Sequence, residues 1–319
     1  MPNLNVAVLA PTGYAKDLGK KGTASDITFY NLKRGEDTVT LIEPTRYPER
    51  LAPLFYTASM ADRALLVIEQ ITPTLGEWVL MLQALSVSRG YIILKNYLTP
   101  EQVKPLIRGT VLEQYDFIKE DMNALREQLL REAAENLQAP SGTSAGTVPI
   151  DHHFNVKGIG TVILGGVVKG IIRKHDTLKL YPGERGVLLR SIQKHDDDSD
   201  HAVEGDRVGI ALKNIDAEDL DRGYVLSSDP SLQTRATLSV QAELVAYWPA
   251  PLKEGMVLHI GHWLQFIPAK CVSVTDEGNW RKPTIGLELE KELVFLPGDR
   301  AVLHYLEGGK LRIAGTISL

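Results

Sequence analysis

The hydrophobic pattern of this 319-residue chain changes abruptly near residue 140. Before that point, short apolar runs alternate with longer stretches of helical spacing. After it, glycines separate short β-branched runs at close intervals. The change falls at a small, polar, turn-forming stretch, residues 139–146. A single uniform sheet or helical bundle is therefore excluded, and we expect residues 139–146 to link two kinds of domain.

The first part of the chain has the pattern of a mostly parallel α/β sheet. Apolar runs that predict buried strands lie at residues 6–10, 39–42, 64–68 and 91–94. Helical spacing is found at residues 48–61, 74–88, 101–108 and 119–137. Strands that alternate with helices favour parallel pairing with helices covering the sheet. We expect one α/β domain over residues 1–140.

The rest of the chain has the pattern of antiparallel β structure. Closely spaced glycines between short strands predict a closed barrel over residues 147–229. A Ser-Ser-Asp-Pro break at residues 227–230 ends it, and a new series of short strands follows. We expect a second barrel over residues 232–319, its strands interrupted by Pro249, Pro251, Pro268, Pro283 and Pro297.

Composition excludes several classes of protein. The chain has 35 Lys plus Arg against 40 Asp plus Glu and a net charge of −5, so binding to phosphate backbones requires a local patch, and we expect no DNA partner. Cys271 is the sole cysteine, which rules out an internal disulfide and a cysteine-based zinc site and favours the reducing cytoplasm. No apolar run approaches the roughly 18 residues of a membrane span, so we expect no signal peptide and no membrane partner.

The order α/β domain, barrel, barrel resembles the three-domain translational GTPases. These are elongation factor Tu, its archaeal and eukaryotic equivalent, and the selenocysteine-specific elongation factor. Residues 154–162 (FNVKGIGTV) look like the second-domain signature of that family, and residues 202–209 and 216–226 resemble the closing strands of the same barrel. Residues 191–196 lean toward the selenocysteine-specific branch, and residues 297–299 match a turn of the family's third domain.

The resemblance implies a phosphate loop directly after the first strand. Such a loop reads G-x-x-x-x-G-K-[ST], because glycine lets backbone N–H groups close on phosphate, Lys neutralises it and the hydroxyl holds Mg²⁺. Here Ala10 and Ala15 replace both glycines, and Asp17 places a carboxylate where the hydroxyl is needed. Lys16 alone remains. A short interval between Asp17 and the effector region around Thr23 indicates that the first helix is truncated or missing.

Two further family motifs are also altered. The Asp-x-x-Gly-His segment corresponds to residues 43–47 here, where it begins with Glu43 and carries Arg46 in place of the glycine. The guanine-binding Asn-Lys-x-Asp motif corresponds to Lys95, Asn96, Tyr97 and Leu98. Leucine cannot accept hydrogen bonds from the guanine ring, so we expect the site to have lost its selectivity for guanine.

We therefore predict a GTPase-deficient paralogue of an archaeal-type elongation factor, acting as a binding or regulatory protein in translation, with tRNA, the ribosome or a translation protein as partner. No cofactor is expected, neither GTP nor Mg²⁺. The alternative is an elongation-factor-like GTPase that binds GTP through a non-standard loop, using Lys16 or residues 19–21. A third interpretation is a regulatory protein that competes with a true factor for its partner.

The middle barrel contains the candidate partner-binding residues. In the family this barrel helps to hold the aminoacyl end of tRNA, so the resemblance implies that basic residues there form a small RNA-facing patch. Scattered surface charge is the commoner meaning of such residues. The candidates are Lys157, Arg173, Lys174, Arg185 and Arg190.

Other polar clusters predict no metal site and no different enzyme. Residues 151–153 (Asp-His-His) cannot chelate with both imidazoles, because neighbours in a strand point to opposite faces. His259 and His262 are expected to be ordinary barrel residues, and the acidic run at residues 196–200 lacks the Gly and Glu of a calcium loop. No Ser-His-Asp ordering and no Cys-His pair stands out as catalytic.

Overall fold

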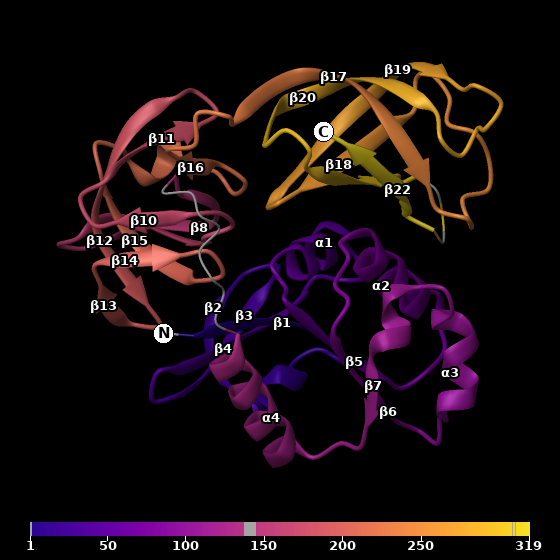
Figure 1. Ribbon diagram of the computed structural model, residues 1–319, viewed down its shortest axis with the longest axis horizontal. Coiled ribbons are helices and arrows are strands. Elements are labelled where there is room, and N and C mark those ends of the chain that lie inside the picture. The colour runs from indigo at the N-terminus through magenta and orange to yellow at the C-terminus, as the bar shows by residue number, and fades with distance from the viewer. Residues whose placement is uncertain (1, 137–144, 308, 310) are drawn as a thin grey trace.

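The alternating part of the sequence forms one mixed sheet in the computed structural model, which describes residues 2–136, 145–307, 309 and 311–319 (Figure 1). Within those residues the strand order is β2-β3-β4-β1-β5-β6-β7, with β4, β1, β5, β6 and β7 parallel and the β2-β3-β4 edge antiparallel. The strands are β1 (Asn3–Leu9), β2 (Lys20–Ala24), β3 (Thr28–Arg34), β4 (Asp37–Glu43), β5 (Arg63–Ile68), β6 (Gly90–Leu94) and β7 (Asp116–Ile118).

Helices cover both faces of this sheet. Leu54, Phe55 and Val103 share a core with Leu9 and Leu66 of the sheet, which places α1 to α3 on one face. On the other face, the side chains of α4 pack against β1 and β5. The helices are α1 (Ala52–Ser59), α2 (Pro73–Ala84), α3 (Pro100–Ile107) and α4 (Met122–Glu135).

The predicted helices are confirmed in type, and their ends follow local capping. The Asp121 carboxylate accepts from the N–H groups of Asn123 and Ala124, so α4 begins at Met122 and not at residue 119. Residue 137, its predicted end, lies outside the described residues, as does most of the predicted linker. Between β1 and β2 there is only a 3₁₀ turn, Tyr14–Asp17, which confirms the predicted loss of the first helix.

Three strands were not predicted from the sequence. Strand β2 has no buried residue and therefore lacks a hydrophobic signal. Only the first three residues of β3 are buried, and β7 is only 3 residues long. Their pairing with longer neighbours, and not their own pattern, makes them strands.

The middle part is the predicted closed barrel. Strand β11 pairs with both β12 and β16, which closes the ring β11-β16-β8-β9-β15-β12. At Gly165 a Cβ atom would lie 2.4 Å from the Pro149 carbonyl oxygen, so only glycine permits the close approach of β8 and β9. The strands are β8 (Thr147–Val156), β9 (Gly160–Gly166), β10 (Ile171–Arg173), β11 (Thr177–Tyr181), β12 (Arg185–Lys194), β13 (Asp197–Ser199), β14 (His201–Val203), β15 (Arg207–Lys213) and β16 (Val225–Ser227).

The last part is the predicted second barrel, closed in the order β17-β20-β19-β18-β21-β22. Pro268 does not interrupt a strand as predicted, since it lies within β19 opposite His259; a strand tolerates proline where the ladder does not need its N–H. The strands are β17 (Gln233–Leu244), β18 (Val257–His262), β19 (Gln265–Thr275), β20 (Thr284–Phe295), β21 (Arg300–His304) and β22 (Ile313–Ser318). The limits 1–140, 147–229 and 232–319 remain predicted domain boundaries.

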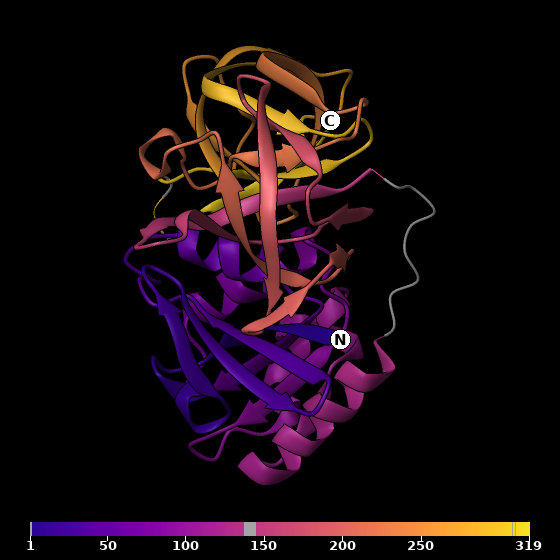
Figure 2. The same cartoon turned by 90° about the vertical axis from the view of Figure 1, so that its left-hand side faces the viewer.

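Both barrels contact the α/β domain. The second barrel lies above the α/β domain in both views, with α1 facing it (Figures 1 and 2). The Phe55 ring of α1 is 5.9 Å from Phe266 and 5.4 Å from His304, and Arg312 forms a buried ion pair with Glu77 of α2. The three parts therefore meet through specific side chains.

Candidate functional site

The loop that follows β1 is occupied by a carboxylate of the same domain. Strand β4 lies beside β1 in parallel register, so Glu43 at the end of β4 reaches the loop at the end of β1. Its Oε2 accepts from the Gly13 N–H at 3.0 Å, and its Oε1 accepts from the Ala15 N–H at 2.6 Å. Gly13 has a φ of 84°, which turns its N–H inward. The loop thus forms an anion site that Glu43 fills.

Burial strengthens this contact. Glu43 is only 4% exposed. A hydrogen bond from an N–H group to an ionised carboxylate is stronger than a hydrogen bond between two neutral groups. Burial raises the pKa of the Glu43 carboxyl, although the bonds from Ala15 and Gly13 and the charge of Lys16 act in the opposite direction. The family motif has the shorter aspartate here, so the extra methylene of glutamate extends the reach of this carboxylate toward the loop. A phosphate would have to displace it.

The other altered positions of the loop provide no replacement ligand. Ala10 is half-buried, and the side chains of Lys16 and Asp17 point to solvent. The backbone carbonyl of Asp17 accepts from Arg126 of α4. Thr23 lies in β2 and Arg46 is exposed. The structure therefore brings residues 10–17 and Glu43 together but leaves Thr23 and Arg46 outside their hydrogen-bond network.

The guanine-motif positions are engaged in contacts within the domain. Lys95 forms an ion pair with Glu120, whose Oε1 also accepts from the Tyr14 hydroxyl at 3.1 Å. Leu98 packs against the apolar core below α1 and α2. The Asn96 amide donates to the Glu69 carbonyl at 3.3 Å. These contacts join the loops at the carboxyl edge of the sheet to one another.

The five basic candidates of the first barrel are all exposed and differ in their partners. Arg185 forms an ion pair with Asp219 at 2.8 Å, and Arg190 donates to the Ile159 carbonyl at 2.9 Å. Lys157, Arg173 and Lys174 have no side-chain ion pair within the described part of the chain. Their role in partner binding stays a prediction.

A basic groove lies between the β2-β3 edge of the sheet and the first barrel. Its volume is about 1080 Å³, and exposed Phe154 and Ile159 line its barrel side. None of the five basic candidates lines it. No sequence pattern indicated this groove, because its cations come from separate elements of two domains. They are Lys16, Lys20, Lys21, Lys33, Arg126 and Arg207, with Asp196 as the carboxylate among the lining residues.

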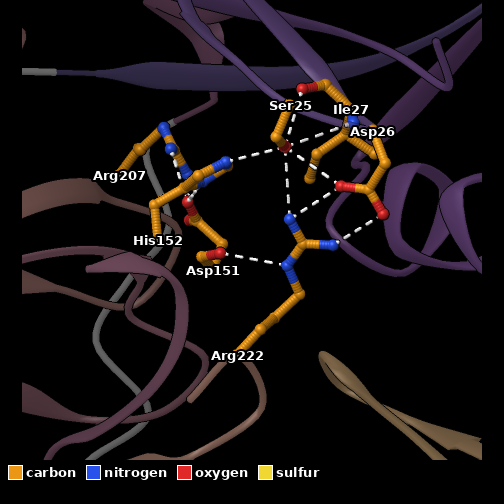
Figure 3. A network of polar contacts seen from close by, with 7 residues as sticks. All are labelled: Ser25, Asp26, Ile27, Asp151, His152, Arg207 and Arg222. Atoms are coloured by element: carbon orange, nitrogen blue, oxygen red, sulfur yellow. Dashed lines mark hydrogen bonds and ion pairs between the residues drawn. The ribbon is translucent and has the colours of Figure 1, made fainter. Parts of the chain in front are cut away.

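A polar network joins the β2-β3 turn to the first barrel beside this groove (Figure 3). Asp151, with a fully buried side chain, accepts from both terminal nitrogens of Arg207 and from His152 Nδ1 at 2.6 Å. His152 Nε2 lies 2.9 Å from the Ser25 hydroxyl. Arg222 donates to Asp26 at 2.9 Å and to Ser25 Oγ at 3.2 Å. Charge from Arg207 and the His152 bond hold the pKa of Asp151 at about 2, against the effect of burial.

A β-bulge explains how the neighbouring side chains of Asp151 and His152 come into contact, which regular strand alternation would prevent. The pairing of β8 with β9 shifts between Ile150 and His152, and this bulge lets the side chains of Asp151 and His152 meet. Sequence analysis missed the cluster, since Ser25, Arg207 and Arg222 are far from residues 151–152 in the chain.

The remaining polar clusters are structural. No group of three metal-binding side chains is found among the described residues. His262 is buried between Asp299 and the Val294 carbonyl, and His259 packs on Phe266. Asp197 in the acidic run pairs with Lys33. No helix in the described residues is long and apolar enough to cross a membrane.

Comparison with known proteins places these sites in context. A family model described as elongation factor Tu domain 2 matches residues 160–227. An uncharacterised protein of Methanocaldococcus jannaschii is 38% identical over 305 residues, 95% of this chain and 94% of that protein. The selenocysteine-specific elongation factor of the same organism is 26% identical over 336 residues, 94% of this chain and 71% of the factor.

Solved structures show the same fold. The selenocysteine-specific elongation factor of Methanococcus maripaludis, in its apo form, has a TM-score of 0.80 at 23% identity and covers 99% of this chain and 79% of its own. The same factor in complex with the GTP analogue GppNHp has a TM-score of 0.81, and the match covers 100% of this chain and 79% of the factor's chain. The likeness of fold therefore extends over the α/β domain and both barrels.

Proposed function

Since the chain belongs to the elongation factor Tu-type family of translation factors and is a paralogue related to the selenocysteine-specific factor, we propose that it is a binding protein of the translation machinery without GTP hydrolysis. Its mechanism is recognition without a nucleotide switch. In switching GTPases, contacts to the γ-phosphate order the switch loops and are released on hydrolysis. In this protein, hydrogen bonds from the loop to Glu43 would hold the loop in place of contacts to a γ-phosphate.

The Glu43 carboxylate in the loop carries this proposal. Gly13 and Ala15 N–H groups already donate to it, so a nucleotide phosphate gains nothing unless Glu43 leaves. Moving a phosphate in beside an ionised Glu43 would also place like charges within a few ångströms of each other. Together with Asp17 at the Mg²⁺ position and Leu98 at the guanine position, this supports the loss of GTP binding.

Permanent side-chain contacts support a fixed arrangement of the three parts. Arg222 of the first barrel pairs with Asp26, and Arg312 of the second barrel pairs with Glu77. Both ion pairs are largely buried, so breaking one partner leaves a charge without compensation. A factor without a γ-phosphate contact then remains in one state.

The basic groove is the surface that best fits an RNA partner. Lys16, Lys20, Lys21 and Arg126 carry no ion pair within the described residues, and Phe154 offers an exposed ring next to them. Cations that follow a backbone and an aromatic ring on which a base stacks are the usual elements of single-stranded RNA binding. We place tRNA or ribosomal RNA at this groove, in preference to the exposed residues Arg173 and Lys174.

The alternative, GTP binding through a non-standard loop, has less support. Lys20 and Lys21 lie in β2 and pair with Asn31 and Tyr30 of β3, so they do not form a loop around an anion. A segment of strand does not converge its N–H groups on one point, as a phosphate cradle requires.

A thermal melt with GTP or GDP and Mg²⁺ tests the missing nucleotide site. A ligand at about 100 times its Kd adds about 2.7 kcal/mol to the free energy of unfolding. We expect no shift of Tm at millimolar nucleotide. A guanine-selective shift that depends on Mg²⁺ and is absent with ATP would overturn the proposal and restore the GTPase.

RNA binding is tested by the salt dependence of tRNA affinity. The double variant K20Q/K21Q should bind more weakly and lose about 1 to 2 from the slope of log K against log salt. The matched control K253Q/K270Q changes two exposed lysines of the second barrel and should bind as the wild type does. Equal losses in both variants would remove the groove from the proposal.

A further inference from the structure

The side chains of Ser25, His152 and Asp151 form a chain of hydrogen bonds in the order hydroxyl, imidazole and carboxylate (Figure 3). His152 Nε2 is 2.9 Å from Ser25 Oγ, and His152 Nδ1 is 2.6 Å from Asp151 Oδ1. We propose that these three residues form a catalytic relay for acyl transfer, with Ser25 as the nucleophile. A relay of this kind is recognised by geometry and roles, whatever the order of its residues in the chain.

Asp151 fixes the tautomer of His152. Its carboxylate is held ionised by two nitrogens of Arg207 and can only accept hydrogen bonds, so His152 Nδ1 carries the proton. The lone pair of Nε2 then faces Ser25, which is the state a general base needs. Arg207 thus acts as a positioning residue, since it orients Asp151 and through it the imidazole.

Hydrogen-bond geometry around Ser25 agrees with this role. Its hydroxyl has one proton, and the nearest acceptor is His152 Nε2 at 2.9 Å, with Asp26 Oδ1 at 3.0 Å and the Ile27 carbonyl at 3.3 Å. Asp26 is already bonded by Arg222. The same arginine donates to Ser25 Oγ at 3.2 Å, which favours negative charge on that oxygen.

The basic groove adjoins the relay, although Ser25, His152 and Asp151 are not among its lining residues. Ser25 lies in an exposed turn. Three residues that line the groove touch the relay or adjoin it: Arg207 binds Asp151, the Phe29 ring is 5.8 Å from His152, and Thr23 is two residues before Ser25. Since unpaired Lys16, Lys20 and Lys21 line the rest of it, the chemical class of substrate is an acyl ester whose alcohol part carries phosphate.

The reaction balances without a cofactor. Ser25 Oγ bonds to the carbonyl carbon while its proton passes to His152 Nε2. The ester C–O bond then breaks, and the leaving alcohol takes the proton from His152. Water next attacks the acyl-serine, again losing its proton to His152, and Ser25 recovers that proton as the acid departs. The sum is ester plus water to acid plus alcohol.

The S25C variant measures the base directly. Cys271 is buried, so the new thiol is the accessible one and its alkylation by iodoacetamide reports the thiolate. The charged and titratable groups around this position are few. His152 and Arg222 contact residue 25 directly and Asp26 is its neighbour in the chain. Asp151 binds His152 from the other side and is itself bound by Arg207. We expect an apparent thiol pKa at least about 1 unit below the usual value near 8.5, shifted back toward it in S25C/H152Q.

The S239C control places a thiol on an exposed strand of the second barrel with no imidazole bonded to it. An S25C profile that equals the S239C profile, or one that H152Q leaves unchanged, overturns the relay and leaves the network as a clamp between domains. An unfolding transition measured for each variant confirms that it is folded before its reactivity is compared.

The wild-type protein supplies the second test. A fluorophosphonate probe should modify Ser25, found by peptide mass spectrometry, and S25A should abolish the label while S239A retains it. No label on Ser25 in the wild type would overturn the proposal without reference to any variant.

The substrate class is tested by two esters that differ in one phosphate. Hydrolysis of 3′-O-acetyl-AMP should exceed that of 3′-O-acetyladenosine in kcat/KM by on the order of 10-fold at low salt, because the groove concentrates anions. K20Q/K21Q should reduce this ratio toward one, with S25A inactive on both. Equal rates for both esters in the wild type would overturn the assigned substrate class. The melts with GTP or GDP that test the proposed function do not depend on any of these outcomes, so failure here is distinct from failure of the proposed function.

Discussion

Two charged clusters, one within the α/β domain and one between it and the first barrel, are built in opposite ways. The Glu43 cluster lies within one domain and satisfies backbone N–H groups of its own loop. The Asp151 cluster joins the α/β domain to the first barrel mainly through side chains, with Ser25 and Arg222 completing it and Arg222 also donating to the Asp151 carbonyl. In the first the carboxylate occupies its own loop, whereas in the second Ser25 lies in an exposed turn near the basic groove.

The difference shows which of the two clusters can still bind an external group. In the first cluster the Gly13 and Ala15 N–H groups both donate to the Glu43 carboxylate. In the second, the serine oxygen and the groove cations retain bonding capacity for an external group. The interface between the α/β domain and the first barrel is therefore the region where we place both of our proposals.

The largest expected effect comes from breaking the buried pair of the second cluster. Arg207→Ala removes the main partner of a carboxylate whose side chain is fully buried, and the loss of one member of such a pair costs about 3 kcal/mol or more in the free energy of unfolding. Urea denaturation measures it. The control Arg185→Ala removes an exposed arginine that pairs with exposed Asp219 and should change stability far less. Equal effects would show that burial does not distinguish the two pairs.

Removing the carboxylate of the first cluster should have a smaller effect that an anion reverses. Glu43→Ala leaves the Gly13 and Ala15 N–H groups without a partner, at a cost of about 1 to 3 kcal/mol. Inorganic phosphate should then raise the Tm of the variant more than that of the wild type. In the control Glu120→Ala, the lost partners are side chains, Lys95 and Tyr14, and phosphate should have no such effect. A phosphate response in the control alone would contradict our account of the loop.

The two clusters should respond differently to acid, because the pKa values of their carboxyl groups are shifted in opposite directions. The pKa of Asp151 is lowered to about 2, so its contribution to stability is present above its unfolded value near 3.9 and is lost as pH falls toward 2. The pKa of Glu43 is raised, so protonation there does not remove stability in the same way. Between pH 5 and 2, the wild type should lose about 2 kcal/mol relative to Asp151→Asn.

Unfolding in urea at stepped pH measures that difference. Buried His304, whose pKa is lowered to about 3, also destabilises the protein in acid, because the unfolded chain takes up the proton first. His304 is present in both proteins, so the difference between them isolates Asp151. Parallel curves for the two proteins would show that Asp151 is not the group responsible.

The sequence located the positions of the first cluster but none of the contacts of the second, for a physical reason. Parallel strands bring their carboxyl ends to one edge, so motif positions at Lys16, Glu43 and Lys95 were expected together and lie together. That Glu43 turns into the loop was not predicted, because a side-chain direction depends on packing. Ser25 and His152 meet only through the docking of two domains and a bulge in β8, and no pattern within either segment encodes that.

The smallest expected effect concerns an exposed ion pair between the α/β domain and the first barrel. Lys33 and Asp197 are 2.5 Å apart, but both side chains are partly exposed, at 34% and 56%. Exposed pairs gain little over hydration and are screened by salt, so Lys33→Ala should change the free energy of unfolding by less than about 0.5 kcal/mol. Adding salt should remove even that difference while leaving the deficit of Arg207→Ala intact. A deficit for Lys33→Ala as large as that of Arg207→Ala would mean that burial does not determine what an ion pair contributes to stability here. The expected inequality instead assigns the larger contribution to the pair whose carboxylate side chain is fully buried.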